Sequence, residues 1–326
     1  MKALITTIPF ATHNRLPIEL LQGAGIDYVI NPFNTKISEE QLAELIPDFE
    51  ILIAGTEPIT EKVLSKASRL KLISRVGIGL DNVDLAAAER RGIKVSYTPD
   101  APAPAVAELA VGLMICLLRN IHVANTELHR GDWHRHMGRR IPEVTVGVIG
   151  VGRIGGRVLR RLSIFGTPRV LVNDLNPNTK LIPELKLEWV GKEVIYKEAD
   201  VISLHLPISA LTKNMIRAEH LRAMKPDALI INTSRGGIIN ENDLADVLTT
   251  GHLGGAAIDV FEQEPYRGPL ANVERCLLTA HMGSMSVDCR SRMEIEATTE
   301  AVRYASGQKL TSGVPEMEYA NQKGRA

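Results

Sequence analysis

The stretch VTVGVIGVGRIGGRV, residues 144–158, decides the fold of this chain. Its first half is apolar and rich in β-branched residues, which predicts a buried strand. Its second half places Gly150, Gly152 and Gly155 in G-x-G-x-x-G spacing and then continues as a helix. A strand that passes through such a glycine turn into a helix is typical of a parallel sheet with helices on its faces.

The glycine spacing also predicts what the turn binds. The first two glycines allow a tight turn and a close backbone approach to a pyrophosphate, and the third lets the helix pack on the strand. The helix N-terminus then faces the phosphates. Asp174 ends the next predicted strand, where a carboxylate accepts hydrogen bonds from the adenosine ribose and repels a 2′-phosphate. The sequence therefore predicts NAD rather than NADP, and disfavours a purely structural glycine turn.

Strand-like and helix-like segments alternate on both sides of this turn. One series occupies residues 2–97, and the second occupies residues 144–280. We therefore predict an α/β protein with two doubly wound parallel sheets. Between the series, residues 98–105 predict a linker and residues 104–128 one long helix. An amphipathic helix over 286–307 is expected to return to the first domain. The predicted domains are 1–100 with 287–326, and 101–286, and residues 311–326 are expected to be loose.

Bulk composition excludes several classes of partner. The 326 residues carry no net charge, so no overall field attracts nucleic acid or an acidic membrane. No apolar run approaches the roughly 18 residues of a membrane helix, and the N-terminus does not resemble a signal peptide. A cytoplasmic location is expected. The three cysteines, Cys116, Cys276 and Cys289, are expected to be reduced thiols rather than disulfides or metal ligands.

Three polar residues follow the last predicted strands: Arg235, Glu264 and His281. A lone histidine after an apolar strand is more often a core residue, so the other two decide the interpretation. Reduction of a 2-keto acid at a nicotinamide needs all three types of side chain. A guanidinium holds the carboxylate and polarises the keto oxygen, and an imidazolium donates the proton. A neighbouring carboxylate favours the protonated imidazole.

Other polar residues at strand ends point to the same edge, because ligands of open α/β sheets bind outside the carboxyl ends of the strands. His205, Pro207 and Thr233 are expected to line the cofactor pocket, and His205 is expected to shape it rather than to perform chemistry. The histidines of HRGDWHRH, residues 129–136, could suggest a metal site. Because no carboxylate or cysteine was recognised at ligand spacing, we expect a solvated surface stretch and no bound metal.

In combination, these motifs resemble the D-isomer-specific 2-hydroxyacid dehydrogenase family over about residues 51–307. The motifs are VGIGLDNVD (76–84), AVAELAVGLM (105–114), GVIGVGRIGGRV (147–158), SLHLP (203–207), INTSRGGIIN (231–240), AAIDVFEQEP (256–265) and TAHMGS (279–284). The resemblance implies that Arg235, Glu264 and His281 are catalytic, so the core-histidine alternative falls away. It also implies a Rossmann NAD-binding domain inserted in a flavodoxin-like substrate domain, a hinge, and a homodimer built on the NAD domain.

The resemblance further implies the contacts of both ligands. The substrate carboxylate is expected on the loop Val76, Gly77 and Ile78, with Arg75 before it. Asp259 is expected to order the nicotinamide pocket. The expected cofactor-binding residues are Gly150, Gly152, Arg153, Ile154, Gly155, Asp174, His205, Pro207, Thr212, Thr233, Asp259 and Gly283.

Within the family, the nearest resemblance is to phosphoglycerate dehydrogenase-type members, supported by SRVGIGLDNVD at 74–84. The usual Arg-Ser pair for a substrate phosphate is replaced by AGTEPIT, residues 54–60, in which Glu57 adds negative charge. Arg75 could still bind a second anion, and the sequence weakly favours a charged or phosphorylated 2-keto acid over pyruvate. The alternative function is an NADH-sensing binding protein with little turnover, which the complete Arg–Glu–His set disfavours.

Overall fold

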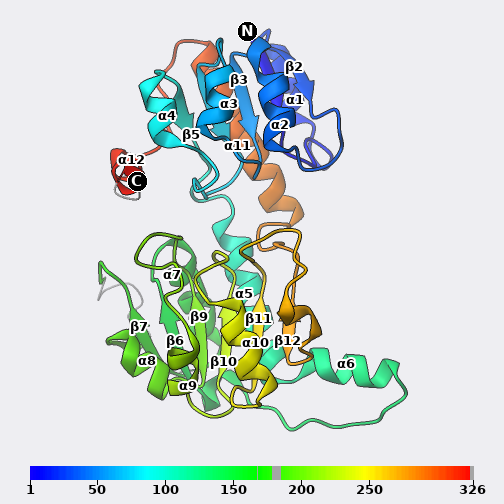
Figure 1. Cartoon of the computed structure of the whole chain (residues 1–326), viewed down its shortest axis with the longest axis vertical. Coiled ribbons are helices and arrows are strands. Elements are labelled where there is room, and N and C mark those ends of the chain that lie inside the picture. The colour runs from blue at the N-terminus through cyan, green and yellow to red at the C-terminus, as the bar shows by residue number, and fades with distance from the viewer. Residues whose placement is uncertain (167, 178–184, 324–326) are drawn as a thin grey trace. The chain divides into compact units, whose positions relative to one another are not determined.

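The computed structural model describes residues 1–166, 168–177 and 185–323. The chain divides into two compact units (Figure 1). Unit 1 consists of Met1–Pro102 and Met285–Ala326, and unit 2 is the continuous segment Ala103–Ser284 between them. Each unit contains one sheet of parallel strands, so the predicted fold class is confirmed.

Unit 1 is built on a five-stranded sheet with the order β2-β1-β3-β4-β5. Its strands are β1 (Lys2–Ile5), β2 (Asp27–Ile30), β3 (Ile51–Ala54), β4 (Leu72–Arg75) and β5 (Lys94–Ser96). Its helices are α1 (Leu16–Gly23), α2 (Glu39–Leu45), α3 (Glu61–Lys66), α4 (Leu85–Arg90), α11 (Val287–Ala305) and α12 (Glu316–Lys323). The strands β3 and β4 are buried along their whole length, as expected where helices cover both faces of a sheet.

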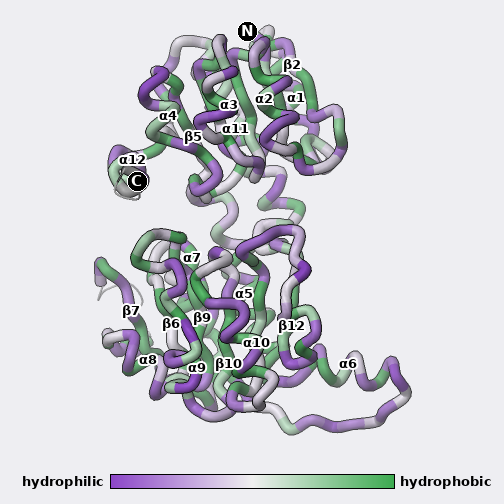
Figure 2. The backbone as a smooth tube through the Cα atoms, in the orientation of Figure 1, coloured by the Kyte–Doolittle hydropathy of each residue, from purple (hydrophilic) through white to green (hydrophobic). Residues whose placement is uncertain are grey.

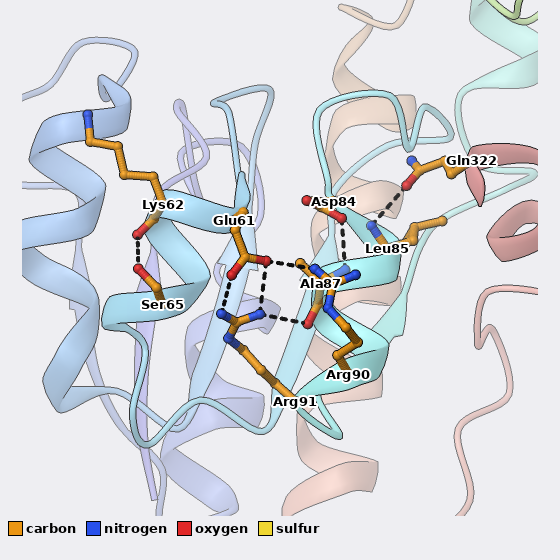
Figure 3. Close-up of polar contacts among 9 residues, drawn as sticks. All are labelled: Glu61, Lys62, Ser65, Asp84, Leu85, Ala87, Arg90, Arg91 and Gln322. Atoms are coloured by element: carbon orange, nitrogen blue, oxygen red, sulfur yellow. Dashed lines mark hydrogen bonds and ion pairs between the residues drawn. The ribbon is translucent and has the colours of Figure 1, made fainter. Parts of the chain in front are cut away.

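The C-terminal segment corrects one expectation. Residues predicted to be loose include the helix α12, which is attached to α4 through Gln322 (Figure 3). Its side-chain oxygen accepts a hydrogen bond from the Leu85 amide at 2.9 Å, and its nitrogen donates to the Leu80 and Val83 carbonyls. The polar composition misled the prediction because a single glutamine that binds free backbone groups at a helix N-terminus leaves no periodic signal. Figure 3 also shows Glu61 of α3 paired with Arg90 and Arg91.

Unit 2 is built on a seven-stranded sheet with the order β12-β11-β10-β9-β6-β7-β8. Its strands are β6 (Thr145–Ile149), β7 (Arg169–Asn173), β8 (Leu187–Trp189), β9 (Val201–Leu204), β10 (Leu229–Asn232), β11 (Gly255–Ile258) and β12 (Cys276–Leu278). Its helices are α5 (Ala103–Leu118), α6 (Ile121–His129), α7 (Arg153–Leu162), α8 (Lys192–Glu198), α9 (Ala218–Ala223) and α10 (Glu241–Thr249). The edge strand β8 was not predicted, because its sequence LEW has a charged residue at its centre and no apolar run.

The long helix predicted over 104–128 is wrong. The chain forms α5 and α6, which are bent by 62° at a break. Asn120 at the break has a φ of 52°, the left-handed conformation in which asparagine often ends helices. Among the described residues no single helix is long and apolar enough to cross a membrane; only this bent pair passes by length and composition. Figure 1 shows α6 projecting from unit 2, and Figure 2 shows that the segment after it is largely hydrophilic.

Candidate active site

The carboxyl ends of three neighbouring strands of unit 2 carry the predicted catalytic residues. The strands β10, β11 and β12 are adjacent and parallel. Arg235 follows β10, Glu264 lies in the loop after β11, and His281 follows β12. Parallel strands present their carboxyl ends at one edge, which is why residues far apart in the sequence meet here.

His281 and Glu264 form a direct pair. The ring nitrogen Nδ1 of His281 lies 2.9 Å from Oε2 of Glu264, and Oε1 of the same carboxylate accepts the Phe261 amide at 3.2 Å. A carboxylate that accepts from Nδ1 fixes the tautomer and leaves Nε2 to exchange a proton with a ligand. Both side chains are partly exposed, so solvent or a substrate can reach the pair.

The loop that carries His281 is held by Asp259. His281 has a φ of 49°, which is uncommon for a residue other than glycine, so the backbone needs local support. The His281 amide donates to the Asp259 carbonyl at 2.8 Å. The buried Asp259 carboxylate accepts from the Thr279 hydroxyl at 2.6 Å and from the Met282 and Gly283 amides at 2.8 and 2.9 Å. In this structure Asp259 therefore organises the histidine loop.

The loop that carries Glu264 has its own support, which the sequence did not reveal. The ring of Phe261 stacks on that of Tyr266 with centroids 4.0 Å apart. Oε1 of Glu241, at the start of α10, accepts the Glu262 amide at 2.8 Å. Burial, together with the charges of Glu262 and Glu264, raises the pKa of the Glu241 carboxyl. The sequence around Glu241 does not predict this contact, because the contact depends on how α10 packs against the loop after β11.

Arg235 lies in a tight turn in which the next residue, Gly236, has no room for a side chain. Its Nη1 donates to the Ser234 carbonyl at 2.7 Å, and its own carbonyl accepts from the Asn232 side chain at 2.8 Å. A Cβ on Gly236 would lie 2.0 Å from the carbonyl carbon of Phe261, so the turn after β10 touches the loop after β11. Arg235 is partly exposed beside the Glu264 loop, where it can bind an anionic ligand.

The glycine turn after β6 has the geometry that its spacing predicts. Gly150 has a φ of 93°, and a Cβ there would lie 2.3 Å from the His205 carbonyl oxygen. A Cβ on Gly155 would lie 2.0 Å from the Gly150 carbonyl oxygen, so this position is where α7 packs against the turn. No described atom lies within 4 Å of a Cβ on Gly152, the N-cap of α7, and no side chain caps the helix. Arg153 and Ile154 begin that helix.

These residues fit a dinucleotide, judged by polar atoms that the protein leaves unpaired. Buried Nδ1 of His205 and Oγ1 of Thr233 have no hydrogen-bond partner within the described part of the chain. Asp174 accepts the Val151 amide at 2.6 Å and the Asn176 amide at 2.8 Å, which leaves further lone pairs for ribose hydroxyls. Burial lowers the pKa of His205 to about 4, so its imidazole is neutral near pH 7.

The remaining predicted cofactor residues lie in turns at the same edge of the sheet. The Thr212 hydroxyl donates to the Pro207 carbonyl at 2.7 Å and accepts the Ser209 amide at 2.7 Å, so it shapes the turn after β9. A Cβ on Gly283 would lie 3.1 Å from Oδ2 of Asp259. Both residues fix backbone around the expected pocket.

The predicted substrate loop belongs to unit 1, where it follows β4. The Val76 amide donates to the Ala54 carbonyl, and the Gly77 amide donates to the Thr98 hydroxyl, both at 2.8 Å. Among these three residues, Ile78 is the one whose amide makes no such bond with any residue that the structure describes, so this amide is available to a ligand. Arg75 is buried and turns back onto this loop: it donates to the Val76 carbonyl and, at 3.3 Å, to Asn82 Oδ1.

Glu57 lies at the neighbouring strand end of unit 1. It is only 2% exposed, and its Oε1 accepts hydrogen bonds from the Thr6 hydroxyl and from the Gly55 amide. Asn82 links it to Arg75, because the Asn82 side chain donates to the Glu57 carbonyl at 2.7 Å. The main chain of Glu57 is therefore one residue away, through Asn82, from the guanidinium next to the substrate loop, while its buried carboxylate is bonded to Thr6 and Gly55.

One expectation about the histidines of residues 129–136 is wrong. They do have a carboxylate companion: Glu127 of α6 lies 2.6 Å from His136 Nε2 and 3.8 Å from His134 Nδ1. The prediction failed because Glu127 comes from the preceding helix and meets the histidines only after the chain turns at residues 130–132.

Comparison with known proteins places this architecture in one family. A family model described as "D-isomer specific 2-hydroxyacid dehydrogenase, NAD binding domain" matches residues 111–283. The hydroxypyruvate reductase of Thermotoga maritima is 36% identical over 267 residues, which cover 80% of this chain and 86% of that protein. A D-3-phosphoglycerate dehydrogenase of Methanocaldococcus jannaschii is 38% identical over 267 residues, covering 78% of this chain and 50% of that longer protein. The crystal structure of a glyoxylate reductase from Paecilomyes thermophila superimposes with a TM-score of 0.85 at 29% identity, covering 97% and 99% of the two chains.

The fold and the glycine turn thus define an NAD-dependent oxidoreductase that acts on the CH–OH group of 2-hydroxy acids. The chain belongs to the D-isomer specific 2-hydroxyacid dehydrogenase family. The family membership predicted from the motifs is confirmed, and so is NAD as the cofactor.

Proposed function

We propose that the protein reduces a small 2-keto acid with NADH, using His281 as the proton donor, Glu264 as its partner and Arg235 as the carboxylate and carbonyl contact. The observation that carries this assignment is the 2.9 Å pair between His281 Nδ1 and Glu264 Oε2 at the carboxyl ends of β11 and β12. A histidine that served stability alone would be expected in the core. The imidazole of His281 is instead partly exposed, at the edge of the sheet where ligands bind.

The roles follow from the chemistry of each group. When bound, the nicotinamide supplies the hydride. Arg235 holds the substrate through charge-assisted hydrogen bonds and polarises the keto oxygen. His281 donates a proton from Nε2 to that oxygen as negative charge develops on it, and Glu264 stabilises the imidazolium before the transfer. In the oxidation direction the same imidazole accepts the hydroxyl proton.

The cofactor would be held at the carboxyl ends of β6, β7, β9 and β10 in unit 2. The uncapped N-terminus of α7, with the open space at Gly152, would accept the pyrophosphate. Asp174 would accept the ribose hydroxyls and disfavour a 2′-phosphate. The unpaired atoms of His205 and Thr233 would bind polar groups of the same ligand. Unit 1 is accordingly proposed as the substrate domain, with the Ile78 amide toward the substrate carboxylate.

We further propose a substrate without a second anion, such as hydroxypyruvate or glyoxylate. The sequence favoured a charged substrate because of Arg75. In the structure, however, that guanidinium donates to its own loop and to Asn82. Asn82 in turn donates to the main-chain carbonyl of Glu57, whose carboxylate is buried at the neighbouring strand end. Like charges held close together in a site of low dielectric cost several kcal/mol, so Glu57 disfavours a phosphate there.

A panel of 2-keto acids assayed with NADH tests the reaction and its selectivity together. We expect steady turnover, with a higher kcat/KM for hydroxypyruvate than for phosphohydroxypyruvate. Glu57→Gln should raise the relative kcat/KM of phosphohydroxypyruvate roughly tenfold or more, and the exposed Glu61→Gln on α3 is the control. Tight NADH binding without turnover of any keto acid would instead favour a sensor. An unchanged ratio in Glu57→Gln would remove only the selectivity claim.

Two further properties belong to this proposal: a cytoplasmic location and a homodimer formed through unit 2. The dimer is supported by the exposed apolar side chains on and after α6, namely Ile121, Leu128, Trp133 and Met137. Monomers in solution, measured by light scattering at working concentration, would contradict it.

A further inference from the structure

The segment that projects from unit 2 holds a second group of residues suited to a ligand. Glu127 lies in the last turn of α6, and His134 and His136 lie in the irregular segment 132–140 that follows. The Glu127 carboxylate and the two imidazoles offer one ligand atom each, and these atoms lie within 4.8 Å of one another. The two imidazole rings are neighbours, with centroids 5.7 Å apart.

We propose that Glu127, His134 and His136 form a binding site for a divalent transition-metal cation, with Zn²⁺ as the best match. In a tetrahedral zinc site with bonds of about 2.0–2.1 Å, neighbouring ligand atoms lie about 3.4 Å apart. His136 Nε2 lies 2.6 Å from Oε2 of Glu127 and His134 Nδ1 lies 3.8 Å from Oε1, so each imidazole is near that spacing from one oxygen of the carboxylate. Because the three ligand atoms all lie within 4.8 Å of one another, side-chain movements that shorten their separations by about 1.4 Å at most bring them to this spacing.

The ligand set selects the class of cation. Two imidazole nitrogens and one carboxylate oxygen suit zinc, nickel or cobalt, whereas magnesium and calcium require oxygen ligands. In the single chain the side chain of His134 is 74% exposed, so it can rotate onto a metal at little cost in packing within the chain. Three protein ligands leave at least one coordination position for water or for another ligand.

The local structure also indicates what the cation would do. The segment 132–140 has no regular secondary structure. Within the described chain it contacts Glu127 through the side chains of His134 and His136 and through the Asp132 amide, which donates to the Glu127 carbonyl at 3.0 Å. A metal bound to both histidines and to Glu127 would attach this segment to the end of α6. The site is therefore a clamp for the projecting segment. It is separate from the proposed acid–base pair, whose residues follow β11 and β12.

Calorimetric titration of Zn²⁺ into the full chain tests the proposal directly. The protein should be free of any purification tag and treated with EDTA before dialysis. We expect one Zn²⁺ per chain. His134→Ala, His136→Ala and Glu127→Gln should each weaken binding by at least roughly 10–100-fold, since removing a ligand costs no less than removing its supporting residue. His129→Ala, which changes an exposed histidine of α6 outside the group, is the matched control and should bind as the wild type does.

A spectroscopic measurement covers the case in which a variant fails to fold. Co²⁺ added to the wild type should give a visible absorption band typical of nitrogen and oxygen ligands at low coordination number, and Zn²⁺ should abolish it by competition. The proposal is overturned if the wild type binds no Zn²⁺ and gives no such band. It is also overturned if His136→Ala or Glu127→Gln binds as tightly as the wild type, or if His129→Ala loses binding.

Discussion

Unit 2 contains two pairs made of the same side chains, and their comparison shows what turns an imidazole and a carboxylate into an acid–base site. His281 and Glu264 are 39% and 29% exposed at 2.9 Å, and His136 and Glu127 are 27% and 24% exposed at 2.6 Å. Distance and exposure are therefore similar. The support differs, because His281 follows a strand and its loop is bonded to buried Asp259, whereas His136 lies in an irregular segment. A histidine loop fixed by buried hydrogen bonds suits proton transfer, and exposed side chains on an irregular segment suit a cation.

The largest expected difference between the pairs is in turnover. His281→Ala should lower kcat for keto-acid reduction by roughly 10²–10⁴-fold, because the proton donor is lost. NADH affinity should barely change, since the dinucleotide is assigned to the glycine turn and Asp174. His136→Ala should leave kcat near the wild-type value. Steady-state kinetics and NADH fluorescence titration measure both effects. Near-normal turnover in folded His281→Ala would contradict the assigned difference between the two pairs and indicate a structural role for His281.

The support of the two pairs should differ next in stability. Asp259→Ala removes the acceptor of the Thr279 hydroxyl and of two loop amides in a buried place. Each unsatisfied buried group costs about 1–3 kcal/mol, so the free energy of unfolding should fall by several kcal/mol. Glu127→Gln, at a surface pair, should change it by about 0.5 kcal/mol or less in metal-free buffer. Chemical denaturation measures the two values, and equal losses would contradict the assigned difference in support.

Turnover distinguishes the two carboxylates on a smaller scale. Glu264→Gln keeps the imidazole but replaces the carboxylate that lies 2.9 Å from its Nδ1 by a neutral amide. A charge-assisted hydrogen bond is stronger than a neutral one, so kcat for reduction should fall, though by less than in His281→Ala. Glu127→Gln should leave kcat unchanged. Steady-state kinetics measure both variants, and an unchanged kcat in Glu264→Gln would exclude a role for the Glu264 charge.

His205 sharpens the comparison, because it is a histidine of unit 2 that burial keeps neutral. Its pKa falls from 6.5 to about 4 on folding. Between these values the unfolded state binds the proton and the folded state does not, so this residue makes stability fall as the pH drops from about 6.5 to 4. His205→Gln should flatten that part of the stability curve. Urea unfolding midpoints at several pH values test it, and an unaltered slope would contradict the effect of burial.

Much of the fold and of the cofactor turn was predictable because the signals are local. Apolar runs such as 144–149 and 229–232 identify buried strands from a few residues. The turn at Gly150 and Gly155 can be predicted from the sequence, because both positions require glycine. A Cβ would collide with the His205 carbonyl at the first position and with the Gly150 carbonyl at the second. The order of Arg235, Glu264 and His281 after successive strands is likewise readable, since parallel strands bring their carboxyl ends to one edge.

Local signals failed where a single residue interrupts a pattern. Asn120, in the left-handed conformation, divides the apolar run that predicted one long helix into α5 and α6. Gln322 attaches a polar C-terminal helix whose composition predicted a loose end. The strand β8, LEW, has no apolar run that would mark it. Each of these features depends on a few specific residues or contacts, and the average hydrophobicity of the segment does not reveal them.

By itself the sequence determined the two parallel sheets, the NAD-type glycine turn and the family, because these depend on backbone conformation and on spacing along the chain. Only the tertiary structure decided which side chains meet. It joined Glu127 to His136, directed the Asp259 carboxylate at the His281 loop, and turned Arg75 back onto its own loop. Such contacts depend on the direction of each side chain after distant segments have packed, and one-dimensional spacing does not encode that direction.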